Sequence, residues 1–326
     1  DFFGRRQSVM RADLVSAIEE YHYRLFDLCF VLYNPIIRRD SRRIMKHMQH
    51  ENLGLLLCQQ QARRGFKHVF CTQSIVDESV LSTTTRERAY VFPLYLYTTP
   101  EDTAGTLFET DEIVRRSNLS SAFVAAVKAK LELAYLPDGQ GDLDSTFGPE
   151  DILHYAYGVF HSPTYRERYG ELLAIDFPRL PLTSDMALFR ELVAKGQELM
   201  SLHLMASPLL DQSPVRFEQS GSMLVESGHP RYLRPGTTDP ETGSSLSQGR
   251  VYVNDRQYFE GIDPAVWEFE IGGYQVLHKW LKDRKRADHK LSFNDVNHYR
   301  KIVVALRETI RLMDEIDEVI PTWPIE

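Results

Sequence analysis

The N-terminal third of the chain alternates short apolar runs with polar or basic segments, which is typical of β-structure. Residues 10–20 have the spacing of a short helix. Residues 21–33 form an almost continuous aromatic and apolar run, which predicts one buried strand. Residues 41–48 predict a short basic helix. Further strands are expected at residues 53–58, 67–72 and 89–97.

The middle and the end of the chain change to the helical period. Residues 120–135 are rich in alanine and contain no helix breaker, and residues 149–160 place their apolar side chains on one stripe. Ser162-Pro163 favours the start of another helix, because serine can cap it and proline needs no N–H partner in the first turn. Residues 184–205 and 292–316 predict the two longest helices.

These changes of pattern predict four parts and an α+β fold. A β-rich N-terminal part that presents loops packs on a helical C-terminal part, with a loop-rich β insertion that is dense in Pro, Gly, Ser and Thr. Near the end, Gly272-Gly273 predicts close backbone packing or a positive φ. The expected parts are residues 1–110 (β-rich), 111–205 (helical scaffold), 206–262 (insertion) and 263–326 (C-terminal helices).

The composition is that of a globular protein, with 43% apolar and 26% charged residues. No apolar run approaches the roughly 18 residues that span a bilayer, and no secretory signal opens the chain. Cys29, Cys58 and Cys71 make no paired framework. We therefore expect a cytoplasmic location and no membrane partner.

Motifs for catalysis are missing from the sequence. It contains no glycine-rich dinucleotide or P-loop motif and no Gly-x-Ser-x-Gly elbow. Asn34-Pro35 is only a superficial echo of the Asn/Asp-Pro-Pro-Tyr/Phe tetrad of adenine methyltransferases, and a strand-ending turn is the favoured interpretation. No catalytic residue and no cofactor are therefore expected within this segment.

Two metal-dependent alternatives compete with ordinary structural roles, and the sequence favours the structural roles in both cases. Asp283-x-Lys285, with Asp263 as a distant acid, fits half of a metal nuclease motif, but its surroundings predict a helix. A zinc site would need ligands at finger-like spacing, which these residues lack. The candidate zinc ligands are His47, His50, Cys58, His68 and Cys71.

The net charge of −8 argues mildly against a simple nucleic-acid binder, but basic residues concentrate in residues 36–67 and 279–290. Arginine and lysine neutralise phosphates, hydroxyl-rich loops contact the DNA backbone, and Arg and Gln read guanine and adenine in the major groove. A second candidate surface lies in the insertion, where Arg216 and Arg250 occur together with Arg231 and Arg234. The candidate DNA-binding residues are Arg38, Arg39, Arg42, Arg43, Lys46, Gln59, Gln61, Arg63, Arg64, Lys67, Thr83, Thr84, Thr85, Arg86, Arg231 and Arg234.

Several long motifs follow one another in a specific order along nearly the whole chain. They are residues 23–27, 68–77, 92–97, 147–169, 176–181 and 266–285. Together they resemble the C-terminal specificity region of type ISP restriction–modification enzymes. One departure is Leu25, where the family more usually has proline.

The resemblance implies a domain that reads an asymmetric site in double-stranded DNA for a neighbouring methyltransferase domain. That domain, which would methylate adenine at N6, and a nuclease and helicase-like motor would precede this segment, and they would use S-adenosylmethionine, ATP and Mg. A sequence-specific target recognition domain is therefore the leading hypothesis. The alternative is a helical scaffold module that docks the methyltransferase without reading bases, and a third is a standalone metal nuclease.

Overall fold

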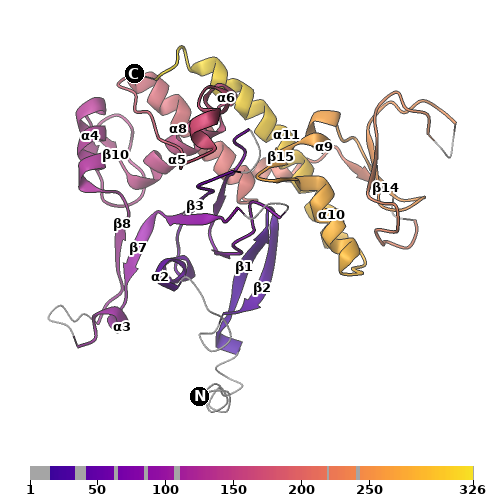
Figure 1. Cartoon of the computed structure of the whole chain (residues 1–326), viewed down its shortest axis with the longest axis horizontal. Helices are drawn as coiled ribbons and strands as arrows, with labels where there is room; N and C mark the ends of the chain where they lie inside the picture. Colours follow the sequence, from indigo (N-terminus) through magenta and orange to yellow (C-terminus); the bar gives the residue numbers. More distant parts are fainter. Residues whose placement is uncertain are drawn as a thin grey trace.

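The structure is a computed structural model that describes residues 15–33, 42–61, 65–83, 87–105, 111–218, 220–239 and 243–325; the side chains of Arg42 and Glu101 are not described. Helices α4, α5, α6, α8 and α11 gather along one side of the molecule (Figure 1). The hairpins β1–β2 and β7–β8 extend away from these helices, and the sheet that contains β14 forms one end. The expected α+β fold is confirmed, whereas the four-part division stays a prediction.

The N-terminal strand is a hairpin rather than the single strand predicted for residues 21–33. Strand β1 (Ile18–Arg24) pairs antiparallel with β2 (Asp27–Leu32) and parallel with β5 (Ile75–Val76). The expected helix over residues 10–20 is wrong from Ile18 onward, and residues 10–14 lie outside the described residues. The turn is hidden in the sequence because its apolar Phe26 adopts a φ of 57° and packs edge-on against Phe70.

A second small sheet has the order β4-β3-β6, and its strands confirm the predictions for residues 53–58 and 67–72. The strand expected at residues 89–97 is divided, because β7 leaves this sheet and pairs with β8. The basic helix expected at residues 41–48 corresponds to α2 and η2. The bounds are α2 Arg42–Met45, η2 Lys46–Gln49, β3 Gly54–Leu57, β4 Val69–Thr72, β6 Tyr90–Pro93, β7 Tyr95–Thr98, α3 Pro100–Thr103 and β8 Val114–Ser117.

The predicted helices of the middle part are present. Helix α4 ends before the expected boundary, because Glu132 adopts a left-handed φ of 57° and residues 134–135 join strand β9. Ser162 caps the helix that was expected to follow it, since its side chain accepts from the N–H of Tyr165. The bounds are α4 Ser121–Leu131, β9 Ala134–Tyr135, β10 Thr146–Phe147, α5 Pro149–His161, α6 Pro163–Arg168, α7 Gly170–Leu173, α8 Met186–His203 and α11 Phe293–Val319.

Helices α5 and α8 pack at backbone contact. A methyl group added at Gly196 would lie 1.8 Å from the carbonyl oxygen of His154, and one added at Gly158 would lie 2.8 Å from that of Leu192. The two glycines therefore set the separation of the helices, since no side chain stands between the backbones.

A buried polar chain ties α5, α8 and α11 together. Thr309 Oγ1 donates to the carbonyl of Ala305 at 2.7 Å, so it accepts from His203 Nε2 at 2.9 Å. His203 Nδ1 is then the acceptor for the hydroxyl of Tyr157 at 2.6 Å. Burial lowers the pKa of His203 to about 3, so this ring is neutral and both of its nitrogens are satisfied.

The insertion forms one antiparallel sheet with the order β11-β14-β13-β12. Val251 and Phe259 on its inner face are fully buried, and Phe259 packs against Tyr299 of α11 with ring centroids 4.3 Å apart. The sheet is thereby fixed to the longest helix. The bounds are η3 Pro208–Asp211, β11 Arg216–Phe217, β12 Arg231–Leu233, β13 Arg250–Tyr252 and β14 Tyr258–Glu260.

The C-terminal part returns to the N-terminal part. Gly272 has a φ of 64°, and an added Cβ would lie 1.8 Å from the carbonyl oxygen of Leu81, so both expectations for the glycine pair are confirmed at Gly272. Arg284 of α10 forms a bidentate pair with Asp27 at 2.7 and 2.8 Å. The bounds are α9 Pro264–Glu268, β15 Glu270–Ile271, β16 Tyr274–Gln275 and α10 Val276–Arg286.

Candidate nucleic-acid interface

One face of the insertion sheet carries an arginine on each of its two edge strands, Arg216 on β11 and Arg231 on β12. Arg231 pairs with Tyr252, and Arg216 pairs with Glu260. Directly paired residues of antiparallel strands point to the same face, and so do residues two positions apart on one strand. Glu260 pairs with Arg250, which lies two positions from Tyr252, so the two pairs share one face. Arg216 and Arg231 are exposed, and no described carboxylate forms an ion pair with either. They are therefore available to a polyanion.

Two other arginines of the insertion are engaged within the protein. Arg250 donates to Asp239 at 2.6 Å and to Glu260 at 2.8 Å, and its guanidinium lies 4.2 Å from the centre of the Tyr258 ring. Because these partners neutralise it on a half-buried surface, Arg250 holds the sheet together. Arg234 pairs with Glu268, but both of these side chains are more than half exposed, so water and salt screen the pair.

A second set of exposed basic residues comes from α2, η2 and β8. Arg43 and Arg116 are exposed, with no described acidic partner, whereas Lys46 pairs with Asp102 at 2.5 Å. Burial lowers the pKa of His47, and the neighbouring charges of Lys46 and Arg116 lower it further. Helix η2 packs against β7, the strand that pairs with β8, so Lys46 and Arg116 lie on neighbouring elements.

The exposed end of α10 forms a third basic surface. Lys282 and Arg286 stand one helical turn apart, and Lys290 follows the helix; all three are exposed, and no carboxylate in the described ranges pairs with them. This basic run is visible in the sequence at residues 279–290, but none of its residues is among the candidate DNA-binding residues. Their spacing of four residues was the available signal.

The other candidate DNA-binding residues fall into three groups. Gln61 donates its side-chain amide to the carbonyl of Leu173 at 3.0 Å, and Lys67 pairs with Glu270 at 2.9 Å, so both already have partners. Gln59 is exposed and Thr83 is half-buried. The candidates Arg38, Arg39, Arg63, Arg64, Thr84, Thr85 and Arg86, together with the side chain of Arg42, lie outside the described residues.

The metal-dependent alternatives gain no support from the geometry. Asp283 lies on α10 and pairs with Lys279, while Asp263 precedes α9 and pairs with Arg307 at 3.1 Å. Within the described ranges, no group of three or more His, Cys, Asp or Glu side chains is placed to hold a metal ion. The helical setting of Asp283 contradicts the strand geometry that the nuclease motif requires.

Membrane insertion is a separate matter. In the part of the chain that the structure describes, no helix combines the length and the apolar character that crossing a bilayer requires.

Solved structures that share this fold were determined with DNA. One is the "ATP-dependent Type ISP restriction-modification enzyme LlaBIII bound to DNA" (17% identity, 95% of this chain and 19% of that chain, TM-score 0.63). A nuclease-deletion mutant of the Type ISP enzyme LlaGI with a DNA substrate mimic matches at 16% identity (99% and 26%, TM-score 0.62). The DrdV–DNA complex matches at 18% identity (97% and 31%, TM-score 0.65).

At these identities the structures establish the fold, and the chain spans less than a third of the length of each. No curated protein is significantly similar to the chain. The family model described as "Type ISP C-terminal specificity domain" matches residues 6–315, which is nearly the whole sequence. The chain therefore belongs to the family of Type ISP C-terminal specificity domains.

Proposed function

We propose that this chain recognises a specific sequence in double-stranded DNA for a restriction–modification enzyme. The family match over residues 6–315 is the observation that carries the proposal. Three solved relatives of the same fold, each described with DNA, support the choice of partner. In this proposal the chain has no catalytic role, and it positions a methyltransferase domain on an asymmetric site.

The outward face of the insertion sheet is the proposed reading surface. Strands can enter the major groove, where arginine donates two hydrogen bonds to guanine. Arg216 and Arg231 are suited to this role because they are exposed and lack described acidic partners, although the chain as a whole carries a charge of −8. The basic surfaces around Arg43 and at the end of α10 are suited to phosphate contacts, which set orientation rather than sequence.

The chemistry of the enzyme is assigned to parts of the polypeptide outside this segment. Those parts would bind S-adenosylmethionine for transfer of a methyl group to adenine N6, and ATP with Mg for translocation and cleavage. A cytoplasmic location, where such an enzyme meets DNA, belongs to the same proposal.

Duplex selection tests the proposal directly. The protein is incubated with a random duplex pool, bound DNA is sequenced, and affinity for the enriched site is measured at several salt concentrations. We expect one asymmetric motif to be enriched. The logarithm of the binding constant should fall linearly with the logarithm of the salt concentration, with a slope of about 0.9 for each phosphate contact.

Matched arginine variants then locate the reading surface. Arg216→Gln and Arg231→Gln should weaken binding to the enriched site by about 1–3 kcal/mol if they contact bases, and should relax the preference at one position. Arg168→Gln removes an exposed arginine on α6 and should leave binding unchanged. Absence of both enrichment and salt-dependent binding would contradict the proposed function. A strong loss of binding in Arg168→Gln, with none in Arg216→Gln or Arg231→Gln, would show that the insertion sheet is not the reading surface.

A further inference from the structure

A polar cavity of about 500 Å³ lies between η3 and the first half of α11. Asn294, Asn297 and Lys301 line it from α11, at the spacing of one helix face. The other side of this helix is apolar and buried, as at Val296 and Tyr299. The helix thus packs in the core through one face and presents a row of hydrogen-bonding side chains to an open space through the other.

Arg300 lies half-buried in the wall of this cavity, and no described carboxylate forms an ion pair with it. Its Nη1 donates to Asn297 Oδ1 and its Nη2 donates to the carbonyl of Ser213, both at 3.4 Å. These contacts are longer than the roughly 2.7–3.2 Å of ordinary N–H···O hydrogen bonds. Each terminal nitrogen carries a second N–H group, so the guanidinium keeps donors for which the described residues provide no acceptor.

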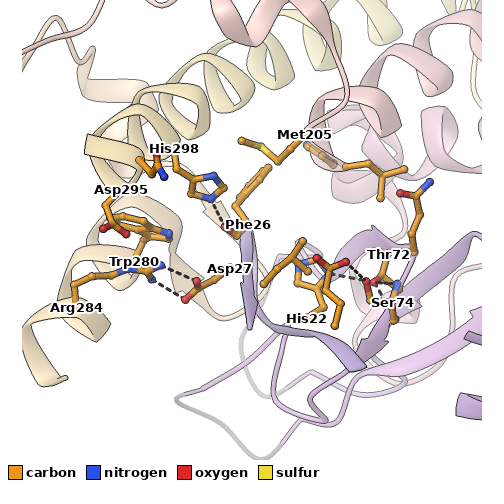
Figure 2. A pocket seen from close by; sticks show the side chains of 16 residues that line it. His22, Phe26, Asp27, Thr72, Ser74, Met205, Trp280, Arg284, Asp295 and His298 are labelled. Carbon is orange, nitrogen blue, oxygen red and sulfur yellow. Dashed lines mark hydrogen bonds and ion pairs between the residues drawn. The ribbon is translucent and has the colours of Figure 1, made fainter. Parts of the chain in front are cut away.

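The neighbouring cavity contains an arginine that the fold does neutralise. The two cavities share two lining residues, one of which is His298. Figure 2 shows that Arg284 forms its bidentate pair with Asp27 there, at 2.7 and 2.8 Å. His298 donates from Nε2 to the carbonyl of Phe26 at 2.6 Å, and burial lowers the pKa of this histidine, so its ring adds no positive charge. Arg300 differs from Arg284 in having no counter-charge of its own.

The other two charged residues that line the cavity neutralise each other. Lys301 pairs with Asp211 of η3 at 2.7 Å, and the side chain of Asp211 is 72% exposed. The described lining residues therefore leave an excess of one positive charge, carried by Arg300, although the whole chain has a charge of −8. An excess cation with unused N–H groups, flanked by side-chain amides, is complementary to an anion.

We propose that this cavity binds a phosphate group. A planar carboxylate matches the guanidinium fork alone, whereas the tetrahedral oxygens of a phosphate can also accept from amides outside the guanidinium plane, here those of Asn294 and Asn297. Two sources supply such a group: the backbone of a DNA duplex, and a free phosphate or phosphorylated small molecule. The first source rests on the proposed function and would add a backbone contact outside the insertion sheet; the second does not depend on that function.

Phosphorus NMR of inorganic phosphate measures binding at the cavity directly, since the line broadens when phosphate is bound. We expect Arg300→Gln to weaken phosphate binding about tenfold or more, because it removes the excess charge and its hydrogen bonds. Asp211→Asn should strengthen binding about threefold, because it removes the carboxylate and leaves Lys301 without its partner. Arg168→Gln, which removes an exposed arginine on α6, is the matched control and should bind phosphate as the parent does.

Several outcomes would overturn the phosphate site. Equal binding by the parent and Arg300→Gln would show that the cavity is not where phosphate binds. Displacement of phosphate by acetate at the same concentration would show that the cavity does not select this group. If circular dichroism shows that Arg300→Gln does not fold, Asp211→Asn decides at an exposed position, and unchanged or weaker binding there would likewise dismiss the site.

Duplex binding at several salt concentrations distinguishes the two sources. If the DNA backbone occupies the cavity, Arg300→Gln should weaken binding to selected and random duplexes alike and lower the salt slope by about 0.9, and duplex should displace inorganic phosphate. If a free phosphate occupies it, the salt slope stays at the parent value and phosphate remains bound beside the duplex. Failure of the parent protein to select any duplex would count against the proposed function, while the phosphate measurement would still test the cavity.

Discussion

Gly196→Ala tests the closest helix contact in the fold. The added methyl carbon would lie 1.8 Å from the carbonyl oxygen of His154 and 3.0 Å from the backbone nitrogen of Gly158. Ordinary contact begins at 3.4 Å, so α5 and α8 would have to separate by roughly 1.5 Å. The obstacle is backbone, which cannot rotate away as a side chain can.

The expected cost follows from this geometry. Overpacking a core costs about 1–3 kcal/mol where side chains can adjust, and more where they cannot. Alanine has a higher helix propensity than glycine, so this substitution inside a helix stabilises the folded state by about 1 kcal/mol and offsets part of that cost. We therefore expect Gly196→Ala to lower the free energy of unfolding by about 2–4 kcal/mol. Gly170→Ala is the matched control, since no atom lies within 4 Å of its added methyl group, and it should be neutral or stabilising by up to about 1 kcal/mol.

Urea denaturation followed by far-ultraviolet circular dichroism measures both variants under the same conditions. An unfolding free energy for Gly196→Ala within about 0.5 kcal/mol of the parent would refute the reasoning, because surface substitutions fall in that range. It would mean that the helices can move apart without loss of packing.

Two further predictions concern buried ionisable groups. Burial lowers the folded-state pKa of His22 and His154 to about 4 and that of His203 to about 3. The unfolded chain binds these protons near pH 6.5, so the stabilisation from the neutral rings is complete above that pH and is lost as the pH falls. The free energy of unfolding, measured from urea midpoints, should fall by about 1–2 kcal/mol per histidine between pH 7 and 5. A flat profile over this range would contradict neutral burial. Asp27→Ala should cost about 3 kcal/mol by leaving Arg284 without its counter-charge, and adding Arg284→Met should recover part of the loss in thermal denaturation; equal effects of the single and double variants would dismiss the coupling.

The helices could be predicted from the sequence because local signals mark their ends. Ser162 and Ser292 precede helices at the expected places, and the apolar stripe of α11 persists along its length. The strands were harder. The turn at Phe26 is buried and apolar, so it resembles a strand interior, and the break after Pro93 separates two strands of different sheets without a glycine or asparagine signal.

The candidate interface was only partly visible in the sequence. Runs of basic residues identified Arg43 and the insertion arginines, but a linear run cannot tell which cations have acidic partners. The contrast between Arg250, which is held by Glu260, and Arg231, which is not, depends on the strand register. That register joins segments separated by loops of uneven length, and no local pattern specifies it.

The alternation of the insertion sheet separates two kinds of substitution. Val251 and Phe259 carry the packing on α11, while Arg216 and Arg231 project from the opposite face. Because neighbouring positions on a strand face opposite sides, a change at the exposed positions Arg216 or Arg231 alters hydrogen bonding and charge without opening the core, whereas Tyr252 and Arg250 on the same face are held within the sheet. Two exposed positions on separate edge strands can therefore vary independently of the packing that fixes the sheet to α11.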